Sequence, residues 1–382
     1  MKLTQDMEQY ILASQAELIA LIRDLCAIPA PSHFEMRRAQ YCRDWFARSG
    51  FQDVRIDEAL NVVCSNGDTG SNDLVVFMAH TDTVFPDLEP MPIEERDGKL
   101  FCPGVTDDTA NLAVLMICAR YMLSHAQPRD VGVLFVANSC EEGLGNLKGC
   151  RQIMADYGPR IRELITLDGT SLPAIVTDAV GSHRYRITVR TEGGHSFGNF
   201  GNKNAIHYLS AIINALYSIK PPVEGDSKTT YNVGVISGGT SVNTIAQQAE
   251  MLYEYRSDHL YCLTKMEELF FKVIDTYRST GIDVQVERIG ERPCSGNVAP
   301  FARKCLIDRA CASIQNVLGL EPKLSSGSTD ANIPLSMGIP AICISVCNGE
   351  KCHTREEWLS IESLPDGCRF FMDFLSNYFN IE

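Results

Sequence analysis

Apolar positions recur at helical spacing over Met7–Ile28 and predict a first helix. Ser32 and Glu35 fit a capping box for a second helix that runs to about Ser49. Short apolar runs bounded by polar turns predict buried strands, and the apolar segment Asn111–Ser124 predicts a helix between the first two of them. The predicted strands are Leu74–Ala79, Val131–Ala137, Leu164–Leu167 and Ala341–Val346. Strands that alternate with helices indicate an α/β domain with a largely parallel sheet.

From about Gly181 the pattern changes to the order strand, helix, strand, strand, helix, strand. The segments are Arg184–Val189, Lys203–Ile219, Tyr231–Ile236, Met251–Tyr255, Leu260–Thr276 and Ile282–Val286. This order is typical of a ferredoxin-like α+β unit. Segments of the α/β type resume after Pro293, with a helix near Ala302–Leu318, so the unit is predicted to be inserted into the α/β domain.

Length and composition restrict the class of protein. A chain of 382 residues suits about two domains. Apolar residues make up 45% and charged residues 21%, which is typical of globular proteins and excludes disorder and low complexity. The formal net charge of −14 disfavours binding to nucleic acid or to an anionic membrane surface.

The cysteines and the N-terminal segment bear on the compartment. There are 15 cysteines, an odd number without any CxxC pair, so neither a zinc ribbon nor a thioredoxin-type site is indicated. We expect buried, reduced thiols and a cytoplasmic protein. Charges interrupt the N-terminal apolar positions, so no signal peptide is predicted, and no apolar run reaches the ~20 residues of a membrane helix.

Acids and histidines follow the predicted strands, where α/β sheets place their ligands. His80 and Asp82 follow the Leu74–Ala79 strand, and one of them can bind a metal while the other fixes the imidazole tautomer. The alternative is an ordinary turn at a strand end. Asp107 and Asp108 precede the apolar helix, where a cation would relieve their repulsion. The alternative for Asp108 is helix N-capping, which leaves Asp107 unexplained.

Three further places carry similar residues. Glu141 and Glu142 end the second strand and could divide the roles of base and ligand, or form a solvated acid pair. Asp168 follows the third strand and, taken alone, fits an Asp-Gly turn. His353 lies in a polar loop, where a lone histidine usually has no function.

Taken together, these residues supply nitrogen and carboxylate oxygen, the ligand atoms that zinc and similar divalent ions bind. Two metals that share a bridging carboxylate would use five of them and leave Asp82 and Glu141 for supporting and base roles. The five are His80, Asp107, Glu142, Asp168 and His353.

These segments resemble the co-catalytic di-zinc metallopeptidases, a family with peptidase T, carnosinase-type dipeptidases, acetylornithine deacetylase and succinyl-diaminopimelate desuccinylase. The motifs are H-T-D-T-V from His80, G-V-T-D-D-T from Gly104, E-E-G from Glu141, Asp168, G-S-T-D from Gly327 and H-T-R-E-E-W from His353. The C-terminal motifs are most similar to peptidase T-like members. The resemblance implies a zinc-exopeptidase-like catalytic domain of residues 1–180 and 293–382, and two divalent ions per chain, with zinc expected and cobalt or manganese as alternatives.

The resemblance also implies a role for each residue. Asp107 bridges the metals, His80 and Asp168 complete one site, Glu142 and His353 complete the other, Glu141 is the base and Asp82 orients His80.

By the same resemblance, residues 181–292 form a lid that joins two chains into a homodimer. His195, in a Gly-Gly-His-Ser segment, matches the lid histidine that reaches the neighbouring subunit's site. Asn243 and Arg256 match the substrate-binding positions of the lid, and an arginine suits a substrate carboxylate. Without the resemblance, Arg256 reads as a surface charge at a strand edge.

The resemblance implies an exopeptidase for short peptides, and specifically an aminopeptidase on di- or tripeptides, in which Glu141 activates a metal-bridging water. Aspartate at position 168 favours peptides, because related deacylases tend to have glutamate there. An N-acyl-amino-acid deacylase is the alternative enzyme. A binding protein that has lost catalysis is the alternative of another class, and the intact Glu141 and ligands speak against it. Cys140 and Cys352, beside Glu141 and His353, depart from the family pattern.

Overall fold

The computed structural model describes residues 3–67, 70, 72–129 and 131–381. The chain forms two compact units. Unit 1 comprises Met1–Ala179 and Gly296–Glu382, and unit 2 comprises Val180–Ser295. Unit 2 is therefore an insertion in the chain of unit 1, as the change of hydrophobic pattern at about Gly181 indicates.

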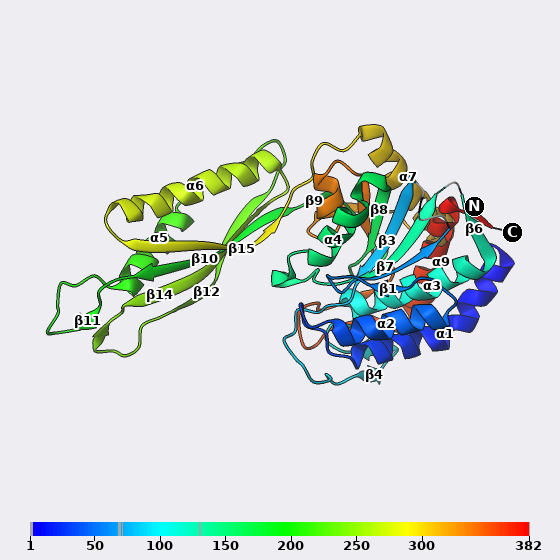
Figure 1. Ribbon diagram of the computed structural model, residues 1–382, viewed down its shortest axis with the longest axis horizontal. Helices are drawn as coiled ribbons and strands as arrows, with labels where there is room; N and C mark the ends of the chain where they lie inside the picture. Colours follow the sequence, from blue (N-terminus) through cyan, green and yellow to red (C-terminus); the bar gives the residue numbers. More distant parts are fainter. Residues whose placement is uncertain (1–2, 68–69, 71, 130, 382) are drawn as a thin grey trace. The chain divides into compact units, whose positions relative to one another are not determined.

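Unit 1 is built on an eight-stranded sheet with the strand order β1-β2-β7-β3-β8-β17-β9-β16 (Figure 1). The central strands β7, β3, β8 and β17 run parallel, and most of their residues are buried, which is why they read as continuous apolar runs. The strands are β1 Arg55–Ile56, β2 Val62–Asn66, β3 Leu74–His80, β7 Gly132–Asn138, β8 Ile161–Leu167, β9 Ala174–Ala179, β16 Lys323–Gly327 and β17 Ala341–Ile344.

Helices cover both faces of this sheet. Along β3, Val75 and Phe77 belong to one hydrophobic core and Val76 and Met78 to another, because successive side chains of a strand point to opposite faces. The first core packs against α1 Gln5–Cys26, α2 Met36–Arg48, α3 Asn111–His125, α7 Pro300–Leu318 and α9 Leu364–Leu375, and the second against α4 Lys148–Tyr157 and α8 Asn332–Ser336.

Two small sheets complete unit 1. β6 Ala126–Pro128 pairs with β20 Phe379–Ile381. The other has the order β18-β19-β5-β4 and consists of β18 Gly349–Glu350, β19 Trp358–Ser360, β5 Lys99–Phe101 and β4 Glu94–Arg96. Pairing of β19 with β5 brings the segment that carries His353 beside the segment that leads to Asp107.

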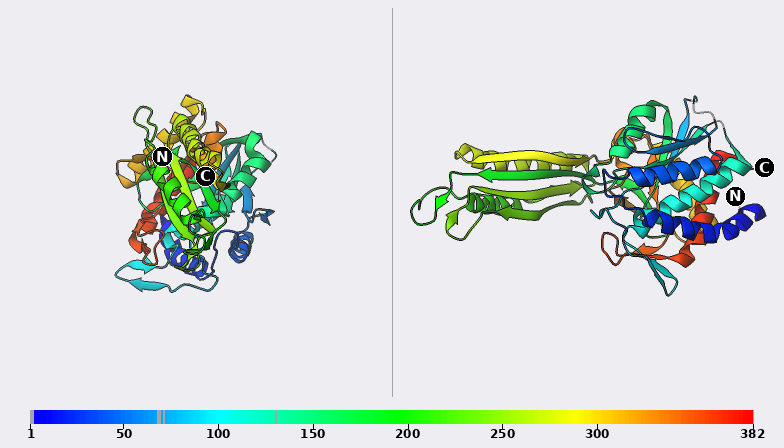
Figure 2. Two further views of the ribbon diagram at one scale, coloured as in Figure 1. Left: turned by 90° about the vertical axis from the view of Figure 1, so that its left-hand side faces the viewer. Right: turned by 60° about the horizontal axis from the view of Figure 1, so that its bottom comes forward.

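Unit 2 has an antiparallel sheet of order β12-β14-β10-β15, with α5 Ala205–Tyr217 and α6 Leu260–Ser279 packed against it. The strands are β10 Gly181–Arg190, β12 Thr229–Gly238, β14 Gln248–Ser257 and β15 Asp283–Arg292. Figure 2 shows these long strands side by side. The predicted ferredoxin-like unit is confirmed. A two-residue ladder, β11 Gly194–His195 with β13 Thr244–Ile245, extends from one end.

One local prediction is wrong. Ser32 and Glu35 form no capping box, since Glu35 occupies the N-cap position of α2 without a side-chain cap. Both side chains instead contact residues far along the chain: Ser32 donates to Asp82, and Glu35 accepts from Cys140. Among the described residues, no helix combines the length and apolar character that crossing a membrane requires.

Candidate metal centre

Three neighbouring strands of unit 1 end at the same edge of the sheet and bring the candidate residues together. His80 is the last residue of β3, Glu141 and Glu142 follow β7, and Asp168 follows β8. Because β7, β3 and β8 are parallel, their carboxyl ends lie side by side. Asp107 lies in the short helical segment Val105–Ala110, which directly precedes α3 and which, together with Gly104, we call the Asp107 turn. The loop between β18 and β19 carries His353.

Asp107 lies between two groups of possible ligands. Its Oδ1 is 3.1 Å from Nε2 of His80, and its Oδ2 is 3.0 Å from Nε2 of His353. Nε2 of His353 is also 3.1 Å from Oε1 of Glu142. Ligand atoms in each of two groups lie within 4.8 Å of one another: His80, Asp107 and Asp168, and Asp107, Glu142 and His353. Oδ1 of Asp107 thus faces His80 and Oδ2 faces His353, which is the arrangement that a carboxylate bridging two metal ions requires.

The donor set fits two divalent ions. Zinc binds imidazole nitrogen and carboxylate oxygen at about 2.0–2.2 Å, so neighbouring ligand atoms in a tetrahedral site lie about 3.3–3.6 Å apart. The contacts of 3.0–3.1 Å made by Asp107 and His353 are close to that separation. All donors are nitrogen or oxygen, which suits zinc, cobalt and manganese.

The tautomer of His80 leaves one ring nitrogen available as a ligand. Nδ1 lies 3.0 Å from the backbone carbonyl oxygen of Asp82, and a carbonyl can only accept, so Nδ1 carries the proton. Nε2 is then the atom with a free lone pair, and it points toward Asp107. The backbone of Asp82 thus contributes to orienting this imidazole.

The Asp82 carboxylate holds the backbone of the candidate base. Oδ1 accepts the N–H of Glu141 at 2.9 Å, and Oδ2 accepts the N–H of Glu142 at 3.0 Å. The hydroxyl of Ser32 donates to the same Oδ2 at 2.6 Å. Asp82 is fully buried, so these donors replace the water that a carboxylate needs. Glu141 itself shares a third group, within 4.8 Å, with His80 and Glu142.

The cluster concentrates negative charge away from water. Burial and the charge of Asp107 raise the pKa of Glu142 to about 7 and that of Asp168 well above its usual value. Hydrogen bonds to Asp107 and Glu142 raise the pKa of His353 to about 10. Protons therefore neutralise part of the cluster, and divalent cations can take their place.

Sequence reasoning misassigned Asp108. It does not cap α3, whose N-cap position is Ala110. Its Oδ2 accepts the backbone N–H of His80 at 2.8 Å, and burial raises its pKa well above the usual value. Glu357, in the H-T-R-E-E-W motif, makes contacts that the sequence does not predict, because its carboxylate accepts the backbone N–H groups of Thr106 and Asp107. Neither contact has a local sequence signal, because 28 and 250 residues separate the partners.

Unit 2 brings together two of its three candidate residues. The β11–β13 ladder pairs His195 with Thr244, and the backbone N–H of Ser196 donates to the carbonyl oxygen of Asn243. Nδ1 of His195 accepts the backbone N–H groups of residues 197 and 198, each at 3.2 Å. The neutral ring therefore carries its proton on Nε2, which is left as a donor.

Arg256 lies elsewhere in unit 2. It is near the other end of β14, eight residues or about 26 Å from Gln248 at the usual rise of a strand. Its guanidinium donates to both carboxylate oxygens of Glu254, at 3.0 and 3.1 Å. The structure therefore does not bring Arg256 together with His195 within this unit.

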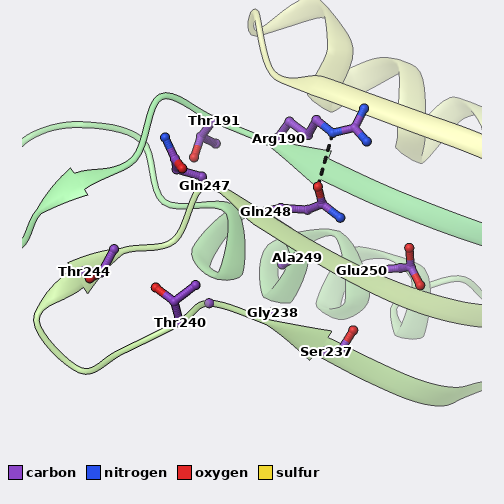
Figure 3. A pocket seen from close by; sticks show the side chains of 11 residues that line it. Arg190, Thr191, Ser237, Gly238, Thr240, Thr244, Gln247, Gln248, Ala249 and Glu250 are labelled. Carbon is purple, nitrogen blue, oxygen red and sulfur yellow. Dashed lines mark hydrogen bonds between the residues drawn. The ribbon is translucent and has the colours of Figure 1, made fainter.

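The end of unit 2 that carries His195 also holds a cavity of about 580 Å³ (Figure 3). Most of its lining residues have polar or charged side chains, and they come from the end of β10, the end of β12, the β12–β13 connection and the start of β14. Nε of Arg190 donates to Oε1 of Gln248 at 3.4 Å across one side. Thr244, the partner of His195 in the ladder, lines it as well.

The fold and the donor set define a metal-dependent hydrolase. Residues 76–377 match the model of peptidase family M20/M25/M40, so the chain belongs to this family. Its members include dinuclear metal-binding peptidases, and the clusters around Asp107 provide for two divalent ions.

The proteins to which this chain is similar carry different names. Succinyl-diaminopimelate desuccinylase of Corynebacterium glutamicum is 24% identical over 364 residues, 94% of this chain and 96% of that protein. Aminopeptidase PepT of Bacillus cereus is similar in structure, with a TM-score of 0.72, 21% identity and coverage of 95% of this chain and 98% of that one. Bacillus subtilis YxeP, a dinuclear metal-binding peptidase of family M20, has a TM-score of 0.62, 17% identity and coverage of 95% and 97%.

Proposed function

We propose that this protein is a di-zinc exopeptidase that removes the N-terminal residue from di- and tripeptides. The observation that carries the hydrolytic part of the proposal is the position of Glu141. A carboxylate oxygen of Glu141 lies within 4.8 Å of possible ligand atoms of His80 and Glu142, which belong to different ligand groups. Asp82 accepts the backbone N–H of Glu141, so a base is held beside both groups. When bound, two divalent ions polarise a carbonyl oxygen and lower the pKa of a water molecule.

The side chains of the protein move the proton. Glu141 accepts a proton from the attacking water and passes it to the amine nitrogen as the C–N bond breaks. Nε2 of His195, which carries the ring proton, donates a hydrogen bond to the oxyanion. Asp82 keeps Glu141 in place through the backbone contact. Asn243 and Arg256 bind the substrate. Because a tripeptide spans at most about 11 Å and about 26 Å separate the two ends of β14, we propose that Asn243 and Arg256 at one site come from different chains of the homodimer. The planar guanidinium suits a peptide carboxylate.

Two observations concern the substrate and favour different candidates. Aspartate at position 168 and the similarity in structure to an aminopeptidase named PepT support a peptide substrate. The curated relative named succinyl-diaminopimelate desuccinylase supports the second candidate, an N-acyl-amino-acid deacylase. Both reactions break an amide bond with the same groups, so the two candidates differ in the substrate they accept.

A matched pair of substrates separates the two candidates. Unblocked di- and tripeptides and their N-acetylated forms are incubated with the zinc, cobalt or manganese protein, and the products are identified. For an aminopeptidase, acetylation abolishes hydrolysis, because a charged amine that pairs with carboxylates becomes an uncharged amide. Faster cleavage of the acetylated compound, with release of acetate, would refute the aminopeptidase and support the deacylase.

We also infer a homodimer through unit 2. β12 is an edge strand of ten residues without charge or proline, and Val235 and Ile236 on it are 52% and 56% exposed. Such an edge readily pairs with another strand. Phe197, Phe200 and Val242, which flank His195 and Asn243 in sequence, are at least 90% exposed. An apolar tip of this kind supports docking of the His195 segment on a second chain.

The proposed compartment is the cytoplasm. Each of the fifteen cysteines is a free thiol, and twelve of them are buried. Burial raises the pKa of Cys140 and Cys352 to about 12, so both are protonated and unreactive near neutral pH. Free thiols throughout the chain suit a reducing compartment.

A further inference from the structure

A buried carboxylate outside the donor set holds the turn that presents Asp107. Glu357 has no exposed surface and accepts four hydrogen bonds. Its Oε2 accepts the backbone N–H of Gly104 at 2.6 Å. Its Oε1 accepts the N–H and the hydroxyl of Thr106, at 2.8 and 2.5 Å, and the N–H of Asp107 at 3.0 Å. A buried carboxylate needs such a set of donors to remain ionised.

The same residue belongs to the segment that supplies His353. Glu357 is four residues beyond His353, and its backbone carbonyl accepts the N–H of Cys102 at 3.2 Å. Its side chain and backbone therefore join the Asp107 turn to the His353 loop. That connection matters because the His353 side chain is 56% exposed, whereas the His80 side chain is 1% exposed and packed on all sides.

We propose that Glu357 is a positioning residue of the metal centre. It holds the Asp107 turn and the His353 loop at a fixed position relative to each other. This inference rests on the proposed metal centre and extends it to a residue that binds no metal itself. The group formed by Asp107, Glu142 and His353 depends on this positioning more than the group formed by His80, Asp107 and Asp168 does, because His353 lies on an exposed loop.

Glutamine in place of Glu357 is the sharpest perturbation. The amide has one acceptor oxygen and one NH₂ group, which can only donate. In one orientation the NH₂ faces the N–H of Gly104, and in the other it faces the N–H groups of Thr106 and Asp107. Either orientation sets donor against donor, so the turn must move. Loss of such a supporting contact typically weakens metal binding about 10–100-fold.

The test uses metal-stripped full-length protein titrated with zinc in the presence of a competing chelator. The control is Glu356→Gln, because that neighbouring carboxylate is 72% exposed and pairs only with Lys351 among the contacts of the described residues. We expect two zinc equivalents for wild type and control, and an affinity about 10–100-fold lower for the weaker equivalent in Glu357→Gln. Unchanged affinities in a folded Glu357→Gln protein overturn the inference. A wild-type protein that binds no zinc refutes the metal centre itself.

A second readout does not depend on metal. In metal-free protein, hydrogen exchange at the amides of Gly104, Thr106 and Asp107 should be slow in wild type and faster in Glu357→Gln. If Glu357→Gln does not fold, Thr106→Val decides. It removes the hydroxyl that donates to Glu357, together with the 3.5 Å contact of that hydroxyl with Sγ of Cys352, and leaves the backbone donors to Glu357 in place. We expect it to weaken the second zinc equivalent roughly threefold to tenfold. A lower melting temperature with unchanged zinc affinity would mean a merely structural contact and overturn the inference.

Discussion

Replacing Asp82 with asparagine tests whether this carboxylate positions the base. Asp82 is fully buried, and its two oxygens accept the N–H groups of Glu141 and Glu142 and the hydroxyl of Ser32. Asparagine keeps the shape but places an NH₂ group at one of these oxygens. If it replaces Oδ1, it faces the N–H of Glu141, and if it replaces Oδ2, it faces the N–H of Glu142.

The expected magnitude follows from these contacts. Each orientation loses at least one hydrogen bond to a charged acceptor, worth about 1.5–3 kcal/mol, and leaves a buried N–H unpaired, at a cost of about 1–3 kcal/mol. Part of this energy is recovered when the loop shifts, so about 2–4 kcal/mol of transition-state stabilisation is lost. At 1.36 kcal/mol per factor of ten, kcat should fall roughly 30-fold to 1,000-fold.

The assay measures kcat and KM at saturating zinc, together with metal content and melting temperature. Ser32→Ala is the matched control, because it removes one donor to Asp82 and leaves the carboxylate in place. Its kcat should fall about tenfold or less. If Asp82→Asn, with both metals bound, turned over at the wild-type rate, Asp82 would not position Glu141.

Three further predictions address the base, protons and the partner subunit. Glu141→Gln should lower kcat roughly 10²–10⁴-fold with metal content retained. If the variant instead lost its metals and kept its rate per bound metal, Glu141 would be the ligand and Glu142 the base. Zinc affinity should rise from about pH 6 to about pH 9, because contacts with Asp107 raise the pKa of His353 to about 10 and the ring must lose a proton before it binds a metal. Calorimetry in buffers of different ionisation enthalpy measures the protons that are released. Inactive His195→Ala and Glu141→Gln chains should regain activity when subunits exchange, and exchanged but inactive hybrids would exclude a role for His195 across the dimer.

The sequence predicts best the strands whose pattern of apolar residues follows from burial of one or both of their faces. The run Leu74–Ala79 reads as a buried strand because β3 has a core on each face. The alternation in Arg184–Val189 and Met251–Tyr255 reads as strands because one face of the unit 2 sheet packs against helices. The edge strand β16, Lys323–Gly327, escapes prediction because it is short and mostly exposed, so no apolar periodicity marks it.

The polar contacts around the metal centre are less predictable. A local pattern assigned Ser32 to a helix cap, but its partner Asp82 lies 50 residues away. Glu35 similarly contacts Cys140, at a separation of 105 residues. Propensity and spacing carry no information about such distant partners. The candidate ligands can be proposed from the sequence because each follows a predicted strand or lies in a motif, whereas the role proposed for Glu357 rests on its contact with Thr106, which no local pattern predicts.

The number of metal ions per chain tests the central claim most directly. Metal-stripped wild type and His353→Ala are titrated with zinc, and bound metal is counted by elemental analysis at each step. The shared Asp107 predicts two ions in wild type and one tightly bound ion in His353→Ala, retained by His80 and Asp168. Saturation of wild type at one ion or none, or two ions bound with wild-type affinity by His353→Ala, would contradict the account.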